Sequence, residues 1–452
     1  MKKIAIVGAG EIGTFLAERL TEEKNDVTVI DKDPQILAIL QESMDVAGYL
    51  GNATRIEDLT AAGVSDVDLF IATTRQDETN LISCLLADEL KVPHKIAVTR
   101  YLGLREQRKS LESRHLGIDL LVNSSEALLN EVLNLVETTG AAEVARFADG
   151  RIIFISFLVE EHSALTYLTV DELCGGDQER RFSVATILRD GALLEPSSDL
   201  VFKEGDYIYL LTTRTHLPEL NDVLNVETIK SRTAIIAGDN FFSQILAGAL
   251  INRHFHVTML TSSDEKTQLL QSQFQNRTQF QVETGEGSDV KLLRRIKVPS
   301  TSVFIAANKD DSANLTACLV AKSLGVGKTI AIIRRHDLAP LCRRFGVDAH
   351  IAPHLATAKV VQEMVHENRV LSYRAVSQSN LEVIELEAMP KSRAVKENIG
   401  KLKLPPGVVI GGIASGERTT LPRGKDRIQP RDKVIVLTLP EHILEVEEIF
   451  GH

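Results

Sequence analysis

Tryptophan is absent from this chain of 452 residues, and cysteine is rare. The four cysteines include no pair at C-x-x-C spacing. This pattern argues against a disulfide framework and a structural zinc site, and it fits a reducing compartment. Hydrophobic residues make up 44% of the chain and charged residues 25%, which is enough to form globular domains with cores of their own.

An excess of positive charge and a long apolar run are also missing. The formal net charge of −11 argues against a broad nucleic-acid-binding face and against a polybasic membrane anchor. The most apolar stretch, residues 234–251, contains one acidic and three polar residues between positions 239 and 244, so a buried strand, turn and helix explain it better than a membrane span. The N-terminal apolar run is short and shows no secretory signal, and we expect a soluble protein.

The most informative stretch is residues 3–31, KIAIVGAGEIGTFLAERLTEEKNDVTVID. An apolar run leads into glycines at G-x-G-x-x-G spacing, and a helical stripe and a second apolar run follow. Gly8 permits a tight turn, Gly10 lets the backbone approach a phosphate, and Gly13 lets the helix pack against the strand. The N–H groups and positive dipole end of that helix would face the anion. The order of strand, turn and helix predicts a dinucleotide-binding site.

An acidic residue ends the second apolar run. Asp31 lies 18 residues after Gly13, and its carboxylate can accept hydrogen bonds from ribose hydroxyls. It would repel a 2′-phosphate, which favours NAD(H) over NADP(H). ATP, ADP and AMP carry the same adenosine ribose, so Asp31 does not exclude them. The alternative is a purely structural turn, and the acid at the expected position argues against it.

Strands and helices alternate as far as about residue 136, including a helix expected over residues 105–114. This alternation predicts a doubly wound parallel sheet with helices on both faces. Ligands bind outside the carboxyl ends of the strands in such folds. The loops that should converge there follow Val7, Ile30, Leu50, Ile71 and Val98.

Four polar residues on these loops are candidate ligand contacts. Arg100 can pair with phosphate oxygens or form a surface ion pair. Thr73 and Thr74 can offer hydroxyls to a ligand or cap the next helix. Lys32 can lie near the ribose or simply be solvated. The residues alone leave these alternatives open.

The pattern changes near residue 142 and later restarts. Short strands and turn signals indicate a smaller α+β unit, after which residues 233–238 (TAIIAG) repeat residues 3–8 (KIAIVG). Residues 306–324 match residues 72–90 at a constant offset of 234, and a second small unit ends the chain. The order is therefore A-B-A′-B′, with a pseudo-two-fold relation between the halves and further self-association expected. Aligned identities include Asp77/Asp311, Asn80/Asn314 and Arg100/Arg334.

The second half lacks key residues of the first fingerprint. Where the first half reads GAGEIG, the second reads GDNFFS, and no acid ends its second strand. A side chain at Asn240 would obstruct a pyrophosphate, and Asp239 would disfavour its charge. We predict that the second site binds a nucleotide weakly or not at all.

Motifs for metal binding or catalysis are not evident. His254 and His256 would point apart on a strand, and Pro353 interrupts the helix that His350 and His354 would need for joint ligation. No Ser-His-Asp set, H-E-x-x-H motif or G-K-[ST] loop is visible, and the small units are too short and loop-rich for a typical substrate domain. We predict no metal site, no catalytic residue and no enzymatic activity.

Several motifs together resemble the regulator-of-potassium-conductance (RCK) nucleotide-binding domain. They are Gly8–Gly13 with Asp31, Gly51–Thr54, Ala72–Thr74 with Asp77, Glu78 and Asn80, and Val98–Arg100. Residues 187–206 resemble the small C-terminal domain that follows it. Two such pairs in tandem, covering essentially the whole chain, are similar to the peripheral cytoplasmic regulatory subunits of bacterial Trk-type potassium uptake systems.

This resemblance implies two Rossmann-like doubly wound domains, each followed by a small α+β domain. The implied domains are residues 1–138 and 139–228, then 229–368, with a degenerate site, and 369–452. It also implies a homo-oligomer, a dimer or tetramer, that forms a gating ring on the inner face of the membrane. The partner would be a potassium-translocating membrane subunit, and the ligands would be NAD(H) and ATP or ADP.

The resemblance assigns the ligand contacts to one set of residues in the first half. The set is Gly8, Ala9, Gly10, Glu11, Ile12, Gly13, Asp31, Lys32, Asn52, Ala53, Thr73, Thr74 and Arg100. Gly8, Gly10, Ile12 and Gly13 would hold phosphates, and Asn52 and Ala53 would lie near the adenine. Asn52 stands where an aspartate is usual, so its contact with the adenine amino group is an open point.

Other functions remain as alternatives at this stage. An NAD-dependent oxidoreductase would share the glycine fingerprint, and substrate-dependent NADH turnover would reveal it. A regulator of another cation channel or transporter would share the whole architecture. A cytoplasmic scaffold with vestigial nucleotide folds is a third alternative, which the intact first fingerprint argues against.

Overall fold

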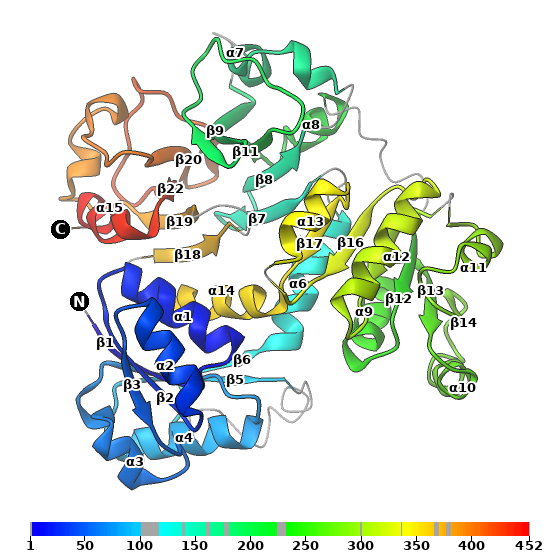
Figure 1. Cartoon of the computed structure of the whole chain (residues 1–452). Helices are drawn as coiled ribbons and strands as arrows, with labels where there is room; N and C mark the ends of the chain where they lie inside the picture. The colour runs from blue at the N-terminus through cyan, green and yellow to red at the C-terminus, as the bar shows by residue number, and fades with distance from the viewer. Residues whose placement is uncertain are drawn as a thin grey trace. The chain divides into compact units, whose positions relative to one another are not determined.

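The computed structural model describes residues 2–100, 117–137, 141–159, 163–175, 180–223, 232–298, 301–335, 337–365, 370–376 and 381–451. These residues form two six-stranded and two five-stranded sheets with helices packed on them (Figure 1). The six-stranded sheets are parallel and the five-stranded sheets antiparallel. The predicted α/β fold, with two Rossmann-like parallel sheets each followed by a small α+β part, is confirmed. The helix expected over residues 105–114 lies outside the described residues.

The first parallel sheet has the strand order β3-β2-β1-β4-β5-β6. Apolar runs such as IAIV in β1 are buried on both faces, as strands between two helical layers must be. The strands are β1 (Lys3–Val7), β2 (Asp26–Asp31), β3 (Ala47–Leu50), β4 (Leu69–Ala72), β5 (His94–Thr99) and β6 (Leu120–Asn123). The helices between them are α1 (Glu11–Glu22), α2 (Pro34–Ser43), α3 (Ile56–Ala61) and α4 (Asp77–Glu89), with a 3₁₀ turn η1 (Val64–Asp66).

The second parallel sheet repeats this order as β14-β13-β12-β15-β16-β17. Residues 234–251 form a strand, turn and helix, as predicted. The strands are β12 (Thr233–Ala237), β13 (His256–Thr261), β14 (Phe280–Thr284), β15 (Val303–Ala306), β16 (Thr329–Ile332) and β17 (Ala349–Ile351). The helices are α9 (Phe241–Asn252), α10 (Asp264–Gln273), α11 (Val290–Arg295), α12 (Asp311–Ser323) and α13 (Ala339–Arg344).

The antiparallel sheets also share one strand order, β10-β9-β11-β8-β7 and β21-β20-β22-β19-β18. The A-B-A′-B′ repeat is therefore present in the topology. The first comprises β7 (Glu143–Phe147), β8 (Ile152–Leu158), β9 (Phe182–Arg189), β10 (Ala192–Leu194) and β11 (Tyr207–Thr213), with η3 (Ala164–Tyr167), α7 (Val170–Cys174) and α8 (Leu217–Val223). The second comprises β18 (Val370–Ala375), β19 (Glu382–Glu387), β20 (Val409–Ser415), β21 (Arg418–Thr420) and β22 (Lys433–Thr438), with η5 (Arg393–Val395), η6 (Ile399–Lys401), η7 (Pro440–His442) and α15 (Ile443–Phe450).

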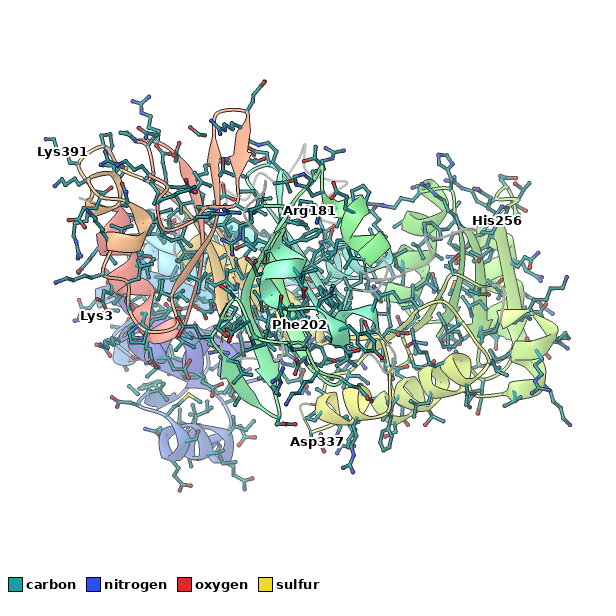
Figure 2. The ribbon with its side chains drawn as sticks, turned by 90° about the horizontal axis from the view of Figure 1, so that it is seen from above. Lys3, Arg181, Phe202, His256, Asp337 and Lys391 are labelled. Carbon is teal, nitrogen blue, oxygen red and sulfur yellow. The ribbon has the colours of Figure 1, made fainter. Side chains whose placement is uncertain are left out.

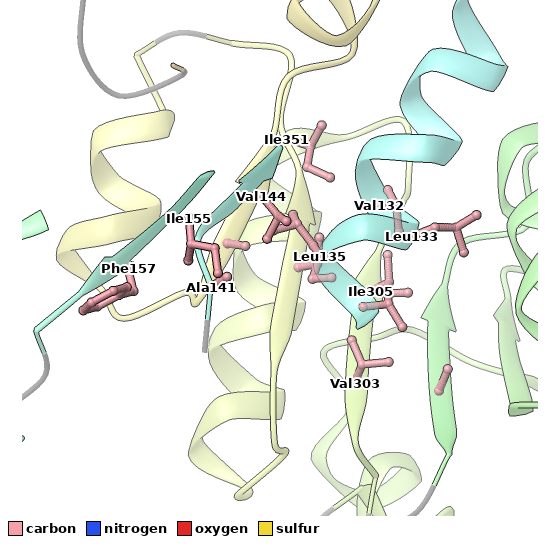
Figure 3. Close-up of a cluster of buried hydrophobic side chains, with 14 of the residues drawn as sticks. Val132, Leu133, Leu135, Ala141, Val144, Ile155, Phe157, Val303, Ile305 and Ile351 are labelled. Carbon is pink, nitrogen blue, oxygen red and sulfur yellow. The ribbon is translucent and has the colours of Figure 1, made fainter. Parts of the chain in front are cut away.

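Two helices pack away from the sheet that precedes them in the chain. The described residues form two compact units, residues 1–127 with 354–452, and residues 128–353. Most of α6 (Ser124–Glu137) belongs to the second unit, and Figure 3 shows its Val132 and Leu135 close to Ile305 of β15. In the first unit, Ala358 and Val361 of α14 (Pro353–Val365) share a core with β1 and β2. The packing thus exchanges one helix between the halves, whereas the expected domain ranges follow chain order.

Charged side chains lie mainly on the surface. Figure 2 shows the side chains around Lys391 and Asp337 extending outward from the ribbon, and both residues are exposed. Phe202, labelled in the same view, is 1% exposed and belongs to the core of the second unit. A buried charged side chain is therefore an exception that requires a specific partner.

Lys328 is such an exception, and it holds the end of α6. Its Nζ donates hydrogen bonds of 2.8 Å to the carbonyls of Leu135 and Ala141. Burial lowers the pKa of the Lys328 ammonium to about 7, nearby Asp348 acts in the opposite direction, and Lys322 lowers the pKa further. The carbonyls at the end of a helix have no partner within the helix, so a lysine here completes the hydrogen bonding of α6.

We expect Lys328→Met to flatten the pH dependence of the stability of the second unit. In the unfolded chain this lysine titrates near 10.5 and in the folded chain near 7, so the unfolded state binds more protons between these values. Stability should rise with pH in that window by up to about 1.4 kcal/mol per pH unit, and the variant should lack this contribution. Urea unfolding from pH 7 to pH 9.5 measures it. The exposed Lys291→Met is the control, and equal slopes for wild type and Lys328→Met would contradict the assignment.

Candidate functional site

The predicted site residues of the first half gather at the carboxyl edge of the first parallel sheet. The strand order changes direction between β1 and β4, and ligands bind at such a switch point in doubly wound folds. The loops after β1, β2, β3, β4 and β5 all leave the sheet at this edge, because the strands are parallel. The convergence expected from the sequence is therefore present.

The glycine turn between β1 and α1 has the conformation that its three glycines allow. Gly8 has a φ of 98°, a region that other residues rarely adopt. A Cβ on Gly13 would lie 1.8 Å from the carbonyl oxygen of Gly8, so only glycine fits at this crossing of helix and turn. A Cβ on Gly10 would meet nothing within 4 Å. The protein itself therefore does not require glycine at position 10, which agrees with a role in admitting a ligand.

No side chain caps the N-terminus of α1. Gly10 is the N-cap residue and offers no capping group, so N–H groups of the first turn remain available to an anion. Glu11, the first helical residue, is exposed, and Ile12 is half-buried. This is the geometry expected of a phosphate-binding helix terminus.

Asp31 braces the turn from the end of β2. Its Oδ2 accepts a 2.6 Å hydrogen bond from the backbone N–H of Ala9, and its Oδ1 accepts one of 3.0 Å from Asp33. The residue is partly exposed, so its carboxylate remains accessible to a ribose hydroxyl. Lys32 follows with an exposed side chain.

The two threonines after β4 act mainly within the protein. The hydroxyl of buried Thr73 donates to the carbonyls of Val7 and Gly8 at 3.0 and 3.2 Å. The hydroxyl of Thr74 donates to Oδ1 of Asn80 at 2.6 Å. Both side chains therefore shape the turn, and their oxygens can still accept a hydrogen bond from a ligand.

Three residues missing from the predicted set hold the loops in place. Asn80 is fully buried, accepts from the backbone of Thr74 and donates to the carbonyl of Val98 at 2.8 Å, which joins the loops after β4 and β5. Asp77 accepts from the backbone N–H of Arg100 at 3.1 Å. Asp58 accepts from the backbone N–H of Asn52 at 2.7 Å. The identities Asp77/Asp311 and Asn80/Asn314 between the repeats were the signal for two of them.

The outer contacts of the predicted set are placed at the same edge. Asn52 accepts hydrogen bonds from the backbone and hydroxyl of Thr54 with its side-chain oxygen, and Ala53 is buried. The Arg100 side chain is exposed, and its backbone is held by Asp77, which accepts from its N–H, and by Ser125, whose hydroxyl donates to its carbonyl at 3.1 Å. The structure thus brings all the predicted positions to one edge, with Lys32 and Arg100 at its exposed rim.

The corresponding turn in the second half is filled by its own side chains. Oδ1 of Asn240 accepts from the backbone N–H of Ser243 at 3.1 Å and so caps α9. Asp239 accepts from the backbone and hydroxyl of Ser262 and forms a 2.8 Å ion pair with Lys266. Burial raises the pKa of the Asp239 carboxyl, but the hydrogen bonds from Lys266 and Ser262 together lower it by more, so that this pKa lies below its ordinary value. A carboxylate that stays ionised at this position disfavours a phosphate.

The supporting scaffold, in contrast, is the same in both halves. Asn314 donates to the carbonyl of Ile332 at 2.8 Å, as Asn80 does to Val98. Asp311 accepts from the backbone N–H of Arg334 at 2.7 Å. The second half therefore keeps the architecture of the loops and differs at the residues that would touch a phosphate.

The histidine pairs considered from the sequence lie on different elements. His254 has a φ of 65° and precedes β13, so the expectation that it shares a strand with His256 was wrong. His350 lies on β17, and His354 lies on α14. Across the described ranges, no three His, Cys, Asp or Glu side chains group as a metal site would need. Among the same residues, no helix is both long and apolar enough to cross a membrane.

Comparison with protein families finds matches over most of the chain. Residues 4–124 and 234–353 each match the TrkA-N domain, and residues 383–451 match the TrkA-C domain. The two TrkA-N matches coincide with the two parallel sheets.

Curated relatives match along their whole length. A Trk system potassium uptake protein TrkA of Haemophilus influenzae is 28% identical, with 99% of this chain and 98% of the relative covered. A Trk system potassium uptake protein TrkA homolog of Archaeoglobus fulgidus is also 28% identical, with 99% and 100% covered. A Trk system potassium uptake protein TrkA of Azorhizobium caulinodans is 26% identical, with 99% of this chain and 98% of the relative covered.

Solved structures share the fold. The GsuK RCK domain aligns with a TM-score of 0.58 and 18% identity, covering 99% of this chain and 94% of that chain. The GsuK channel bound to NAD aligns with a TM-score of 0.58, 18% identity and coverage of 99% and 79%. At this identity the likeness concerns the fold alone.

Proposed function

This chain belongs to the TrkA family, with two TrkA-N domains and a C-terminal TrkA-C domain, and from that premise we propose that it is the nucleotide-sensing regulatory subunit of a Trk-type potassium uptake system. It acts in the cytoplasm as a homo-oligomeric gating ring on a potassium-translocating membrane subunit. The first half binds NAD(H) and the adenine nucleotides ATP and ADP. The chain is not an enzyme, and its repeats divide the sequence into residues 1–138, 139–228, 229–368 and 369–452, with α6 and α14 each packed in the compact unit of the other half.

One observation carries the proposal: the glycine turn of the first half is open, whereas the equivalent turn of the second half is filled by its own side chains. Gly10 leaves room for a ligand and Asp31 is accessible. In the second half Asn240 stands at the position of Gly10 and Asp239 at that of Ala9, and no acid stands at the position of Asp31. A single site on a duplicated scaffold is what a sensor needs, because one occupied site can bias both halves.

The geometry of the glycine turn supports the proposed phosphate contacts, and the family resemblance supports the proposed adenine contacts. The N–H groups at the start of α1 bind the phosphates, with Gly8, Ala9, Gly10, Ile12 and Gly13 shaping their approach. Asp31 binds the adenosine ribose, and Asn52 and Ala53 lie beside the adenine. Lys32 and Arg100 contribute positive charge at the rim.

Regulation requires that the ligands distinguish two conformations. A nucleotide shifts the equilibrium between the conformations only by its difference in affinity for them. NAD(H) and ATP share the adenosine half and differ in charge and in the nicotinamide half. Competition for one cleft then converts the ratio of these nucleotides into open and closed populations of the membrane subunit.

Co-purification followed by ion flux tests the proposed function. We expect this chain to bind a Trk-type membrane subunit, and potassium flux in proteoliposomes to change at least severalfold on addition of ATP or NADH. Asp31→Ala should remove that response while the subunits remain associated. The proposal would be overturned if the purified chain oxidised NADH in the presence of a substrate, or if potassium flux did not change on addition of either nucleotide.

A further inference from the structure

An acid and a histidine from distant parts of the chain meet beside the first site. Nδ1 of His354 lies 3.8 Å from Oε2 of Glu11. The His354 side chain is 1% exposed and that of Glu11 is 54% exposed. The imidazole also packs edge-on against Phe15 of α1, with ring centroids 6.4 Å apart. His354 is therefore held by packing, while the Glu11 carboxylate is the partner that can move.

Glu11 occupies the position at which a carboxylate competes with a phosphate. It is the first residue of α1 and directly follows Gly10, the N-cap residue. A carboxylate in the first turn is attracted by the same positive end of the helix that attracts a phosphate. The 3.8 Å separation is longer than a hydrogen bond, and across it the positive end of an imidazole N–H, or the imidazolium when protonated, attracts this carboxylate electrostatically. His354 thus draws the Glu11 carboxylate toward α14 and weakens its negative field at the turn.

We infer that the Glu11–His354 pair sets the selectivity of the first site between dinucleotides and nucleoside triphosphates, an inference that rests on the proposed function. The repulsion between Glu11 and a ligand grows with the charge of the ligand. A dinucleotide diphosphate carries about two negative charges and a triphosphate about four, so the same carboxylate discriminates more strongly against the triphosphate. With His354 in place, that discrimination is reduced and ATP competes with NAD(H).

The pair also gives the second half of the chain a role at the first site. α14 begins directly after β17, the last strand of the second parallel sheet, and His354 is its second residue. Its Ala358 and Val361 are buried in the core of the first unit. His354, which comes from the second parallel-sheet half of the sequence, therefore affects nucleotide affinity at the glycine turn between β1 and α1 without being part of that turn. His354 acts as a positioning residue through Glu11.

Calorimetric titration of the full chain with ATP and with NADH tests the inference. We expect Glu11→Gln to tighten ATP binding about threefold and His354→Phe to weaken it about fivefold, with NADH changed in the same directions by only about 1.7-fold and about 2.2-fold. In the Glu11→Gln background, His354→Phe should have no further effect on ATP, because the charge it acts on is gone. Phenylalanine at position 354 keeps the ring contact with Phe15. If His354→Phe nevertheless fails to fold, Glu11→Gln still tests the inference, because it changes only an exposed side chain.

A matched control separates local charge from net charge. Glu18→Gln removes the same charge from an exposed position of α1, two turns further along, and should leave the ratio of the two affinities unchanged. Equal changes for ATP and NADH, or an undiminished His354→Phe effect in the Glu11→Gln background, would overturn the inference while leaving the proposed function intact. Absence of binding of both nucleotides to the wild-type chain would instead overturn the proposed function.

Discussion

Asp31→Ala is expected to weaken the binding of both NADH and ATP by about 10- to 100-fold, which corresponds to the loss of hydrogen bonds to a charged acceptor. Both ligands should suffer because both carry the adenosine ribose. The variant also removes the acceptor that holds the backbone of Ala9, so the glycine turn loses its brace. Calorimetry or intrinsic NADH fluorescence measures the affinities.

Asp68 provides the matched control for Asp31. Its carboxylate accepts a 2.8 Å hydrogen bond from the backbone N–H of Lys3, at the amino end of β1 and so at the opposite edge of the sheet. Asp68→Ala should leave nucleotide affinity within about twofold of the wild type. If Asp31→Ala bound NADH and ATP as the wild type does, the carboxylate would have no part in the site.

Gly13→Ala is expected to destabilise the first unit and to reduce nucleotide affinity by more than tenfold. The added Cβ would lie 1.8 Å from the carbonyl oxygen of Gly8 and 2.9 Å from Oγ1 of Thr73, so α1 must move away from the turn. Overpacking of this kind costs about 1–3 kcal/mol, and it displaces the N–H groups that bind the phosphates. Thermal unfolding and titration with NADH measure the two effects.

Gly248 is the matched control for Gly13. Gly13 lies in α1, and Gly248 lies in α9, the equivalent helix of the second half. A Cβ on Gly248 of α9 would meet nothing within 4 Å, so Gly248→Ala should be neutral or stabilising by about 0.5–1 kcal/mol. A Gly13→Ala variant with unchanged melting temperature and affinity would show that the turn tolerates displacement of α1.

Local sequence patterns were sufficient to predict the sheets and the site edge. The run IAIV, three glycines and a helical stripe define β1, the turn and α1 without help from distant residues. The repeat at residues 306–324 then predicted the second parallel sheet. Loss of the second glycine, at Asn240, also predicted that the second turn would differ.

Tertiary packing explains what the sequence did not reveal. α6 and α14 have ordinary amphipathic patterns, and nothing in their spacing says that each packs in the unit of the other half. The ion pair between Asp239 and Lys266 joins residues on different loops. Thr73 appeared free to contact a ligand, because its bonds to the carbonyls of the glycine turn depend on the pairing of β1 with β4.

The number of nucleotides bound per chain tests the central claim, that the first half holds the nucleotide site and the second half does not. Calorimetric titration of the wild type should give one NADH per chain. Gly10→Asp, at a position where a Cβ meets nothing, should abolish NADH binding without unfolding the chain. Asn240→Asp at the equivalent position of the second half removes the amide that donates to the carbonyl of Ala307, and it should leave the affinity and the number of bound NADH unchanged. The account would be contradicted if Gly10→Asp kept its affinity for NADH. It would also be contradicted if the wild type bound two NADH per chain and Asn240→Asp removed one of the two sites.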